Sequence, residues 1–268
     1  MASNNFLAEI IEKKKGRLER RRIERPLDAL RVEALRVRQG TPSHSFSKAL
    51  SSSGQQVNVI AEFKRASPSK GIIRADFSPV DAAHAYEQGG AVAISVLTEE
   101  DYFKGSLEDL GTVRASVALP VLRKDFIFDE YQVYEAAAAG ADAVLLIVAA
   151  LEDQAILSLS RLAEDALGMD VLLEVHTEGE MERSSALGAR VVGVNNRDLH
   201  TFEVSLDTSV RLARRAREGA LLISESGLRT REDLRRLRDC GYGAFLIGET
   251  LMRSERPEEA LRELVGTG

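Results

Sequence analysis

Residues 140–176 read GADAVLLIVAALEDQAILSLSRLAEDALGMDVLLEVH, and the fold can be inferred from this stretch in the middle of the chain. Two apolar runs, at 142–149 and 170–176, flank a segment at 151–167 whose apolar residues recur at helical spacing. Near-continuous apolar runs of this length are typical of strands in a parallel sheet, because such strands are buried on both faces. The stretch therefore predicts a strand, a helix and a second, parallel strand.

The same pattern extends in both directions and covers the chain from about residue 57 onward. The eight predicted strands are VNVIAEF (57–63), AVAISVLT (91–98), LPVLRKDF (119–126), DAVLLIVA (142–149), DVLLEVH (170–176), RVVGVNN (190–196), ALLISES (220–226) and GAFLIGE (243–249). Helical spacing predicts helices at 79–88, 129–139, 151–167, 177–187, 205–218 and 230–239. Eight strand–helix units over about 210 residues match a closed (β/α)8 barrel, so we predict an α/β fold of the TIM-barrel type. The alternative, a doubly wound open sheet, usually carries a Gly-rich dinucleotide loop after its first strand, and EFKRASPSKG (62–71) is not such a loop.

An N-terminal segment precedes the repeating pattern. Residues 1–40 are predicted to be helical, and Pro26 opens a second helical segment within them. A shorter helix is predicted at 45–51, after a turn-rich break at 39–43. Because 268 residues are too few for two average domains, we expect one barrel domain, residues 1–268, with residues 1–50 as a helical extension packed on the barrel.

Composition narrows the class of protein. The single Cys240 excludes a disulfide framework and a zinc cluster, favours a reducing compartment, and is expected to pack in the helix before the eighth strand. No metal site is expected, because metal-ligand spacing is absent among the four His residues, His44, His84, His176 and His200. No apolar stretch is long enough to span a membrane, and the first 22 residues lack the features of a signal peptide. We therefore expect a cytoplasmic protein without a membrane partner.

The net charge of −6, from 36 basic and 42 acidic residues, is unevenly distributed. Residues 1–40 hold 11 basic and 6 acidic residues, a balance of +5, so the remaining chain carries −11. The basic residues concentrate at 13–22, and Glu9, Glu12, Glu19 and Glu24 are interleaved with them at helical pairing distances. We interpret this run as a solvated helix face rather than a nucleic-acid site.

Polar side chains gather at the predicted carboxyl ends of the strands, where a barrel of this kind has its active site. Strand parity predicts that most of these side chains point inward. They are Glu62 and Lys64, Lys124 and Phe126, Glu174 and His176, Asn195 and Arg197, and Glu225, with Ser226 on the other face of its strand. Because an unpaired charge is costly to bury, their convergence indicates a functional site. The alternative is a plug of mutual ion pairs that closes the barrel.

Two lysines stand out against the composition. The chain contains 28 Arg and only 8 Lys, yet two strand ends carry Lys64 and Lys124, each beside an arginine, Arg65 and Arg123. A desolvated ammonium can release its proton at accessible pH, whereas a guanidinium cannot. Lysine at these places indicates proton transfer, imine formation or point-charge binding. General acid catalysis is preferred, because the strand-end carboxylates would keep an ammonium charged.

The loops after the seventh and eighth predicted strands indicate a phosphate site. Ser226 and Gly227 follow one strand, and Gly248 follows the other and precedes ETLMR (249–253), which can start a helix. Backbone N–H groups at such places bind phosphate, and barrels often hold one between these two strands. The loop RASPSKG (65–71), with Lys70, is compatible with a mobile lid and with an ordinary surface loop.

The chain resembles the indole-3-glycerol phosphate synthases of tryptophan biosynthesis in six motifs. They are IAEFKRASPSKG (60–71), PVLRKDFI (120–127), LLEVHT (172–177), VGVNNRDL (192–199), ISESGL (223–228) and FLIGETLM (245–252). The resemblance implies a carboxy-lyase that converts 1-(2-carboxyphenylamino)-1-deoxyribulose 5-phosphate to indole-3-glycerol phosphate, with loss of carbon dioxide and water. It also implies no cofactor, a phosphosugar–anthranilate substrate, no nucleic-acid partner, and a monomer or weak homodimer whose N-terminal extension packs over the top of the barrel.

The resemblance also implies roles for individual residues. Lys124 would be the general acid that protonates the ketone oxygen, and Glu62 would hold and tune it. Glu174 and Lys64 would share the acid–base steps of the dehydration. The other implied positions are Asn195, Glu225 and Ser226 in the polar floor, Arg197 near it, Phe126 in the aryl pocket, Gly227 and Gly248 in the phosphate loops, and Lys64 and Ser67 at the substrate carboxylate or phosphate. Glu249 stands where a hydroxyl side chain would be a further phosphate ligand, so we expect the backbone at this position to supply the contact with the phosphate.

Three alternatives remain at the level of sequence. Phosphoribosylanthranilate isomerase is a similar phosphosugar barrel, but it uses a Cys at the end of the first strand, where this chain has Glu62 and Lys64. A lyase that forms an imine through Lys64 or Lys124 is the second alternative. The third is an inactive barrel that binds nucleic acid through residues 1–40.

Overall fold

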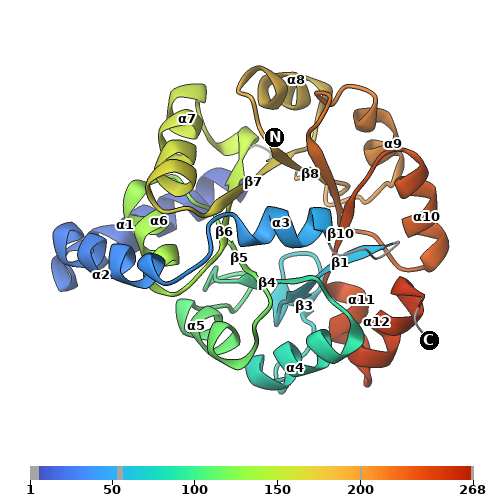
Figure 1. Cartoon of the computed structure of the whole chain (residues 1–268), viewed down its shortest axis with the longest axis horizontal. Coiled ribbons are helices and arrows are strands. Elements are labelled where there is room, and N and C mark those ends of the chain that lie inside the picture. Colours follow the sequence, from blue (N-terminus) through green and yellow to red (C-terminus); the bar gives the residue numbers. More distant parts are fainter. Residues whose placement is uncertain (1–5, 53–56, 200, 267–268) are drawn as a thin grey trace.

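The computed structural model describes residues 6–52, 57–199 and 201–266, so His200 lies outside the described residues. Its strands are β1 (Asn58–Phe63), β2 (Ala66–Ser67), β3 (Gly71–Ile72), β4 (Ala93–Leu97), β5 (Val121–Lys124), β6 (Ala143–Ile147), β7 (Asp170–Val175), β8 (Val191–Asn195), β9 (Leu221–Glu225) and β10 (Ala244–Ile247). All except β2 and β3 form one closed parallel barrel in the order β1-β10-β9-β8-β7-β6-β5-β4 (Figure 1). The predicted (β/α)8 barrel is confirmed strand by strand, and closure excludes the open-sheet alternative. The loop after β1 forms the small antiparallel pair β2–β3.

Helices surround the barrel on its outer side (Figure 1). They are α4 (Pro79–Gly89), α5 (Leu107–Ser116), α6 (Glu130–Ala138), α7 (Asp153–Arg161), α8 (Glu178–Ala186), α9 (Asp207–Ala213), α10 (Arg231–Asp239), α11 (Glu249–Arg253) and α12 (Pro257–Val265). The helix predicted at 205–218 is shorter than expected. The N–H groups of Arg215 and Ala216 donate to the carbonyls three residues back, so the chain tightens into turns after Ala213.

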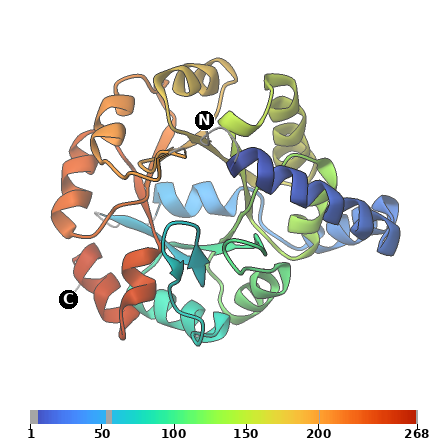
Figure 2. The same cartoon turned by 180° about the vertical axis from the view of Figure 1, so that it is seen from behind.

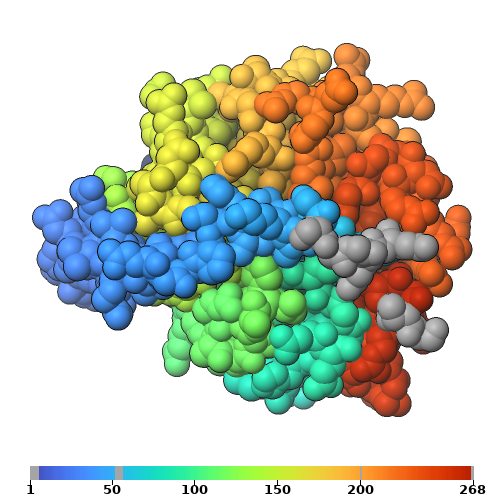
Figure 3. Space-filling model, in the orientation of Figure 1, coloured from blue at the N-terminus to red at the C-terminus, as the bar shows by residue number. Residues whose placement is uncertain are grey.

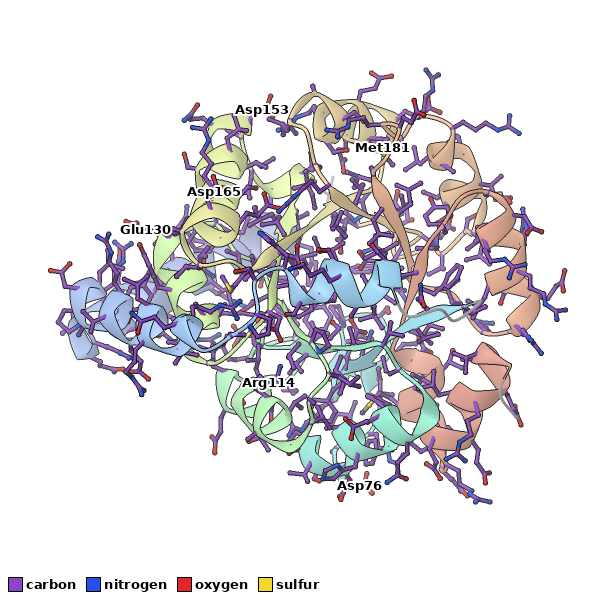
Figure 4. All side chains as sticks on the ribbon, viewed as in Figure 1. Asp76, Arg114, Glu130, Asp153, Asp165 and Met181 are labelled. Atoms are coloured by element: carbon purple, nitrogen blue, oxygen red, sulfur yellow. The ribbon has the colours of Figure 1, made fainter. Side chains whose placement is uncertain are left out.

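Strand parity separates the barrel interior from the layer under the helices. Ile60, Leu122, Leu172 and Ile223 are fully buried and pack together inside the barrel, as their parity predicts. The alternate residues face the surrounding helices and form the larger apolar core. Figure 4 shows side chains such as Asp76 and Asp153 at the periphery of the molecule, and both residues are exposed. Packing of these apolar side chains inside the barrel fixes the strand register, and the polar carboxyl ends of all the strands lie at the same end of the barrel.

The N-terminal extension comprises α1 (Phe6–Glu24), α2 (Leu27–Gln39) and α3 (Ser45–Ser52), and it reaches both ends of the barrel. Helix α3 closes the end where the strands begin: Phe46 and Leu50 are buried against the barrel interior, and Asn58 Nδ2 donates to Leu50 O at 2.8 Å. Figure 3 shows residues of this segment filling the centre of that face. Helix α2 packs on α6 at the side, and α1 crosses the opposite face (Figure 2). Helix α1 therefore lies at the end of the barrel where the strands end, and α3 closes the end where they begin.

Helix α1 is attached to the barrel by ion pairs, so the interpretation of its basic run as a solvated face is wrong for one side of the helix. Lys13 and Lys15 do pair along the helix, with Glu9 and Glu12. The barrel-facing pairs are Lys14 with Asp125 and Glu100, Arg17 with Glu100 and Asp101, Arg21 with Glu100 and Glu135, and Arg22 with Asp129. The acidic partners lie far away in sequence, so local spacing held no signal for them.

Two further features concern the described part of the chain. None of its helices combines the length and the apolar character needed to cross a bilayer. Cys240 caps the end of α10 and packs against the apolar core, as predicted from its position before the eighth barrel strand.

Candidate active site

A cavity of about 770 Å³ opens at the carboxyl ends of the barrel strands. His176, which strand parity also predicts to point inward, is not part of the cavity wall, but every residue to which the family resemblance gives a role lines the cavity. They are Glu62, Lys64, Ser67, Lys124, Phe126, Glu174, Asn195, Arg197, Glu225, Ser226, Gly227, Gly248 and Glu249. The prediction that these side chains converge is confirmed, because the closed barrel brings all of the strand ends to one rim. The cavity is large enough for a substrate of drug-like size.

Lys124, the last residue of β5, lies between two carboxylates. Its Nζ is 2.6 Å from Glu174 Oε2 and 3.1 Å from Glu225 Oε2. Burial disfavours the ammonium, but Glu174, Glu225 and the more distant Glu62 outweigh it and raise the pKa of Lys124. Lys124 therefore enters the cavity as a charged donor, fully protonated at neutral pH.

Glu174, on β7, is the carboxylate that stays ionised. Burial favours its neutral form, but Lys124 and His176 hold the pKa of Glu174 well below its usual range. Its Oε1 accepts a hydrogen bond from Asn195 Nδ2 at 3.2 Å and lies 3.3 Å from His176 Nε2. His176 in turn lies 3.2 Å from Glu180 Oε2, and the two carboxylates overcome burial to raise the pKa of His176 to about 9.

Glu225, on β9, has the opposite electrostatic environment. Burial and the neighbouring Glu174 raise the pKa of Glu225 to about 8, against the opposing effect of Lys124. Its Oε1 has no hydrogen-bond partner among the described residues. A Cβ at Gly193 would lie 2.0 Å from this oxygen, so only glycine leaves room for the carboxyl group there. The environment therefore favours the ionised form of Glu174 and disfavours the ionised form of Glu225.

Glu62 lies beside Lys64 and not against Lys124, which differs from the pairing that the family resemblance implies. Glu62 Oε2 accepts from Lys64 Nζ at 2.5 Å, and Glu62 reaches Lys124 only through its longer-range field. The physical reason is position, since Glu174 and Glu225 occupy the places next to the Lys124 ammonium. A Cβ at Gly248 would lie 2.2 Å from Glu62 Oε2, so this glycine fixes where the carboxylate can stand.

The two arginines beside the lysines point to the outer layer. Arg65 pairs with Asp109, and Arg123, which is 1% exposed, pairs with Asp125 and Glu135. Strand alternation thus sends each lysine to the cavity and its neighbouring arginine under the helices. The contrast between Lys and Arg in the sequence corresponds to a real difference in environment.

The loops after β9 and β10 form one side of the cavity. Ser226 and Gly227 have φ of 68° and 81°, and Gly248 precedes α11, of which Glu249 is the first residue. The Glu249 carboxylate accepts from Arg253 Nε at 3.0 Å. Two arginines that were not predicted from the sequence, Arg229 and Arg253, also line this side. The sequence held one signal for Arg253: it lies four residues after Glu249, a spacing that places the two side chains on the same face of a helix.

The other side of the cavity is aromatic. Phe126 lies 6.3 Å from Phe103, measured between ring centroids. Phe6, at the start of α1, packs edge-on against Tyr102 and Phe202 and lines the cavity. The role of Phe6 in lining the cavity was not predicted. The sequence pattern of residues 6–11 is the same for a helix that lines a cavity and for a helix that only packs on the barrel.

Arg197 and Ser67 connect the cavity to the loop after β1. Arg197 Nη1 donates to Ser69 Oγ at 3.2 Å, and its backbone N–H donates to Asn195 Oδ1. Within the described residues, no group of three or more His, Cys, Asp and Glu side chains is arranged to hold a metal ion. The ammonium and carboxyl groups that line the cavity are suited to proton transfer.

Comparison with known proteins identifies the family of this chain. The family model described as indole-3-glycerol phosphate synthase matches residues 7–264. The chain belongs to this family. An indole-3-glycerol phosphate synthase of Polaromonas naphthalenivorans (strain CJ2) is 53% identical over 208 residues, which are 78% of this chain and 79% of that protein. The one of Dehalococcoides mccartyi (strain CBDB1) is 48% identical over 251 residues, 92% of this chain and 95% of that protein.

A solved structure supports the architecture alone. Thiamine phosphate pyrophosphorylase from Pyrococcus furiosus superposes with a TM-score of 0.57 at 17% identity, over 79% of this chain and 96% of that one. At such low identity the likeness shows a shared barrel and carries no information about the reaction. The assignment to the indole-3-glycerol phosphate synthase family rests on the sequence comparisons.

Proposed function

We propose that Lys124 is the general acid of the indole-3-glycerol phosphate synthase reaction in this chain. The family to which the chain belongs gives the enzyme class, a carbon–carbon lyase of tryptophan biosynthesis that releases carbon dioxide. The substrate is 1-(2-carboxyphenylamino)-1-deoxyribulose 5-phosphate, and the product is indole-3-glycerol phosphate. The observation that carries the proposal is the Lys124 ammonium, held between Glu174 and Glu225 at the floor of the cavity.

Ring closure is the step assigned to Lys124. The aryl carbon that bears the carboxylate attacks the ketone carbon, and the ketone oxygen takes a proton from Lys124 Nζ. Carbon dioxide then leaves, and its bonding electrons restore the aromatic ring. Glu225, 3.1 Å from Nζ and with its pKa raised to about 8, is placed to return a proton to the amine.

Dehydration needs an acid for the departing hydroxyl and a base for the ring proton. We assign these steps to Lys64 and Glu174, which line the same cavity as Lys124: Lys64 pairs with Glu62, and the lowered pKa of Glu174 keeps its carboxylate ionised. Asn195 orients Glu174 through its hydrogen bond. The division of the two roles follows from charge, because an ionised carboxylate can accept a proton and an ammonium can donate one.

The substrate orientation follows from the two walls of the cavity. We assign the aryl ring to the side of Phe126 and the phosphate to the backbone of Gly227, Gly248 and Glu249, all of which line the cavity. Lys64, Ser67 and Arg197 are placed toward the substrate carboxylate and the sugar. Ser226, with positive φ, turns the chain between Glu225 and the phosphate loop.

The competing functions are disfavoured by particular contacts. Both cavity lysines are paired with carboxylates, and the raised pKa of Lys124 keeps its amine protonated, which disfavours attack on a carbonyl to form an imine. Cys240 caps the C-terminal end of α10 and is absent from the cavity wall, which disfavours the isomerase chemistry. The barrel-facing basic residues of α1 already pair with acidic side chains, which disfavours nucleic-acid binding.

We further propose that residues 1–268 act as one domain, with residues 1–50 as its extension, in the cytoplasm and as a monomer or weak homodimer. The support is the burial of α3 in the end of the barrel and the single Cys240. Size-exclusion chromatography with light scattering at two protein concentrations tests the oligomeric state. A tight tetramer would contradict it.

The function is tested by adding the carboxyphenylamino substrate to the purified protein in the presence of EDTA and following indole fluorescence. Turnover with unchanged rate in EDTA is the expected result, and no signal between about pH 6 and pH 9 would exclude the proposal. Borohydride added during turnover distinguishes the imine alternative. Substrate-dependent covalent labelling of Lys64 or Lys124 would favour that alternative.

A further inference from the structure

One lysine of helix α1 is buried although its neighbours are exposed. Lys14 is 4% exposed, whereas the side chains of Lys13 and Lys15 are 47% and 55% exposed. The Nζ of Lys14 lies 2.7 Å from Asp125 Oδ1 and 3.5 Å from Glu100 Oε2. Burying an ammonium is costly unless it is paired, so this position is specified by its carboxylate partner.

That partner is the residue directly after Lys124. Asp125 Oδ1 also accepts from the Phe126 N–H at 2.8 Å, while its Oδ2 accepts from Thr98 Oγ1 at 2.7 Å. The Thr98 N–H donates to the Lys124 carbonyl at 3.0 Å. The carboxylate of Asp125 therefore holds the backbone directly after Lys124, and through Thr98 it links the end of β5 to the end of β4.

The charge of Asp125 depends on Lys14. The side chain of Asp125 has no exposed surface, and burial disfavours its ionised form. Lys14 is the largest of the influences that hold the pKa of Asp125 below its usual range, followed by Arg123. Arg123 is shared with Glu135, so it cannot replace Lys14. Without Lys14, Asp125 loses a partner on the same oxygen that fixes the Phe126 N–H.

We propose that Lys14 is a positioning residue for catalysis: through Asp125 it fixes the strand end that aims Lys124 into the cavity. The helix α1 thereby belongs to the catalytic apparatus and not only to the scaffold. A displacement of about 1 Å in a catalytic group can lower a rate about 100-fold, so a contact 2.7 Å long, one residue from Lys124, has leverage on kcat. The inference rests on Lys124 acting as proposed above.

The experiment compares Lys14→Met with Lys15→Met by steady-state kinetics, at a temperature well below both melting temperatures. Lys15→Met is the matched control, because it removes the adjacent charge from the exposed side of the same helix. We expect Lys14→Met to lower kcat at least tenfold with KM changed less than about threefold, and Lys15→Met to leave both within about twofold. A purely structural role would lower the melting temperature of Lys14→Met and leave kcat of the folded protein unchanged.

A second comparison tests the route through Asp125. Asp125→Asn and the double variant with Lys14→Met should have the same kcat within about twofold, because both mutations break one connection. Should Lys14→Met not fold, Lys14→Gln, which still donates to Asp125, takes its place and should lower kcat less than Asp125→Asn does.

The outcomes separate this inference from the proposed function. A wild-type protein without turnover overturns both. Wild-type turnover with kcat of Lys14→Met equal to that of Lys15→Met overturns the role of Lys14 alone, as do additive effects of Lys14→Met and Asp125→Asn.

Discussion

Replacing Lys124 by Met is predicted to lower kcat about 10⁴-fold. Loss of a positioned general acid typically lowers a rate 10²- to 10⁴-fold, or roughly 3–5 kcal/mol in the barrier. The structure favours the upper end of this range, because Lys124 touches both Glu174 and Glu225. Without the ammonium, Glu174 loses the largest influence that lowers its pKa, so burial favours its neutral form and the dehydration step also loses its base.

The pH dependence of stability gives an independent readout of the same substitution. In the wild type, the lowered pKa of Glu174 contributes stability that is present above its unfolded pKa of 4.5 and is lost as pH falls. In Lys124→Met the buried carboxyls have raised pKa values instead, so their contribution is lost as pH rises. Urea unfolding at about pH 5 and pH 8 should therefore show the larger deficit of the variant at pH 8.

Lys124→Arg is the matched control. It keeps a positive charge between the two carboxylates, so its stability should stay close to that of the wild type. Its rate should fall nearly as far as that of Lys124→Met, because a guanidinium does not release its proton. Indole fluorescence measures both variants without Trp background, since the chain contains no Trp. A Lys124→Met rate within tenfold of the wild type, or an Arg variant that restores turnover, would refute the assignment.

Three further predictions address other parts of the molecule. His176, with its pKa raised to about 9, contributes stability that is fully present below its unfolded value of 6.5 and is lost as pH rises through about 9. His176→Gln should therefore reduce the melting temperature most at low pH, and a deficit independent of pH would contradict this. Gly248→Ala places a Cβ 2.2 Å from Glu62 Oε2, so we expect kcat/KM to fall at least about tenfold, and an unchanged value would count against the close approach of Glu62 to the phosphate loop. Phe46→Ala should lower the free energy of unfolding by about 3–5 kcal/mol with kcat unchanged, because Phe46 is fully buried at the end of the barrel opposite the cavity; a loss below about 1 kcal/mol in urea titrations would contradict its role as a plug.

The barrel itself was predictable because its information is local. Each strand is indicated by an apolar run such as DAVLLIVA (142–149), and alternation along the strand assigns one face to the interior. Ile60 and Leu172 pack inside as their parity requires, and the polar ends of the same series reach the cavity. The candidate site followed from the same rule, since parallel strands end at one rim.

The partners of the charges were not predictable from the sequence. Spacing along α1 indicated pairs within the helix, and Lys13 and Lys15 form them. The pairing of Lys14 with Asp125 depends on how the extension crosses the barrel, which no local pattern encodes. The same holds for Glu62, whose contact with Lys64 was decided by the positions of other carboxylates on distant strands.

Whether Lys124 delivers the first proton can be seen in a crystal structure with a substrate analogue whose ketone is reduced to an alcohol, so that it cannot cyclise. We predict the alcohol oxygen within hydrogen-bond distance of Lys124 Nζ, roughly 2.7–3.2 Å, with the phosphate at the backbone of Gly227 and Gly248. An alcohol oxygen bound to Lys64 instead, with Lys124 still enclosed by Glu174 and Glu225, would contradict the role of Lys124 as the general acid.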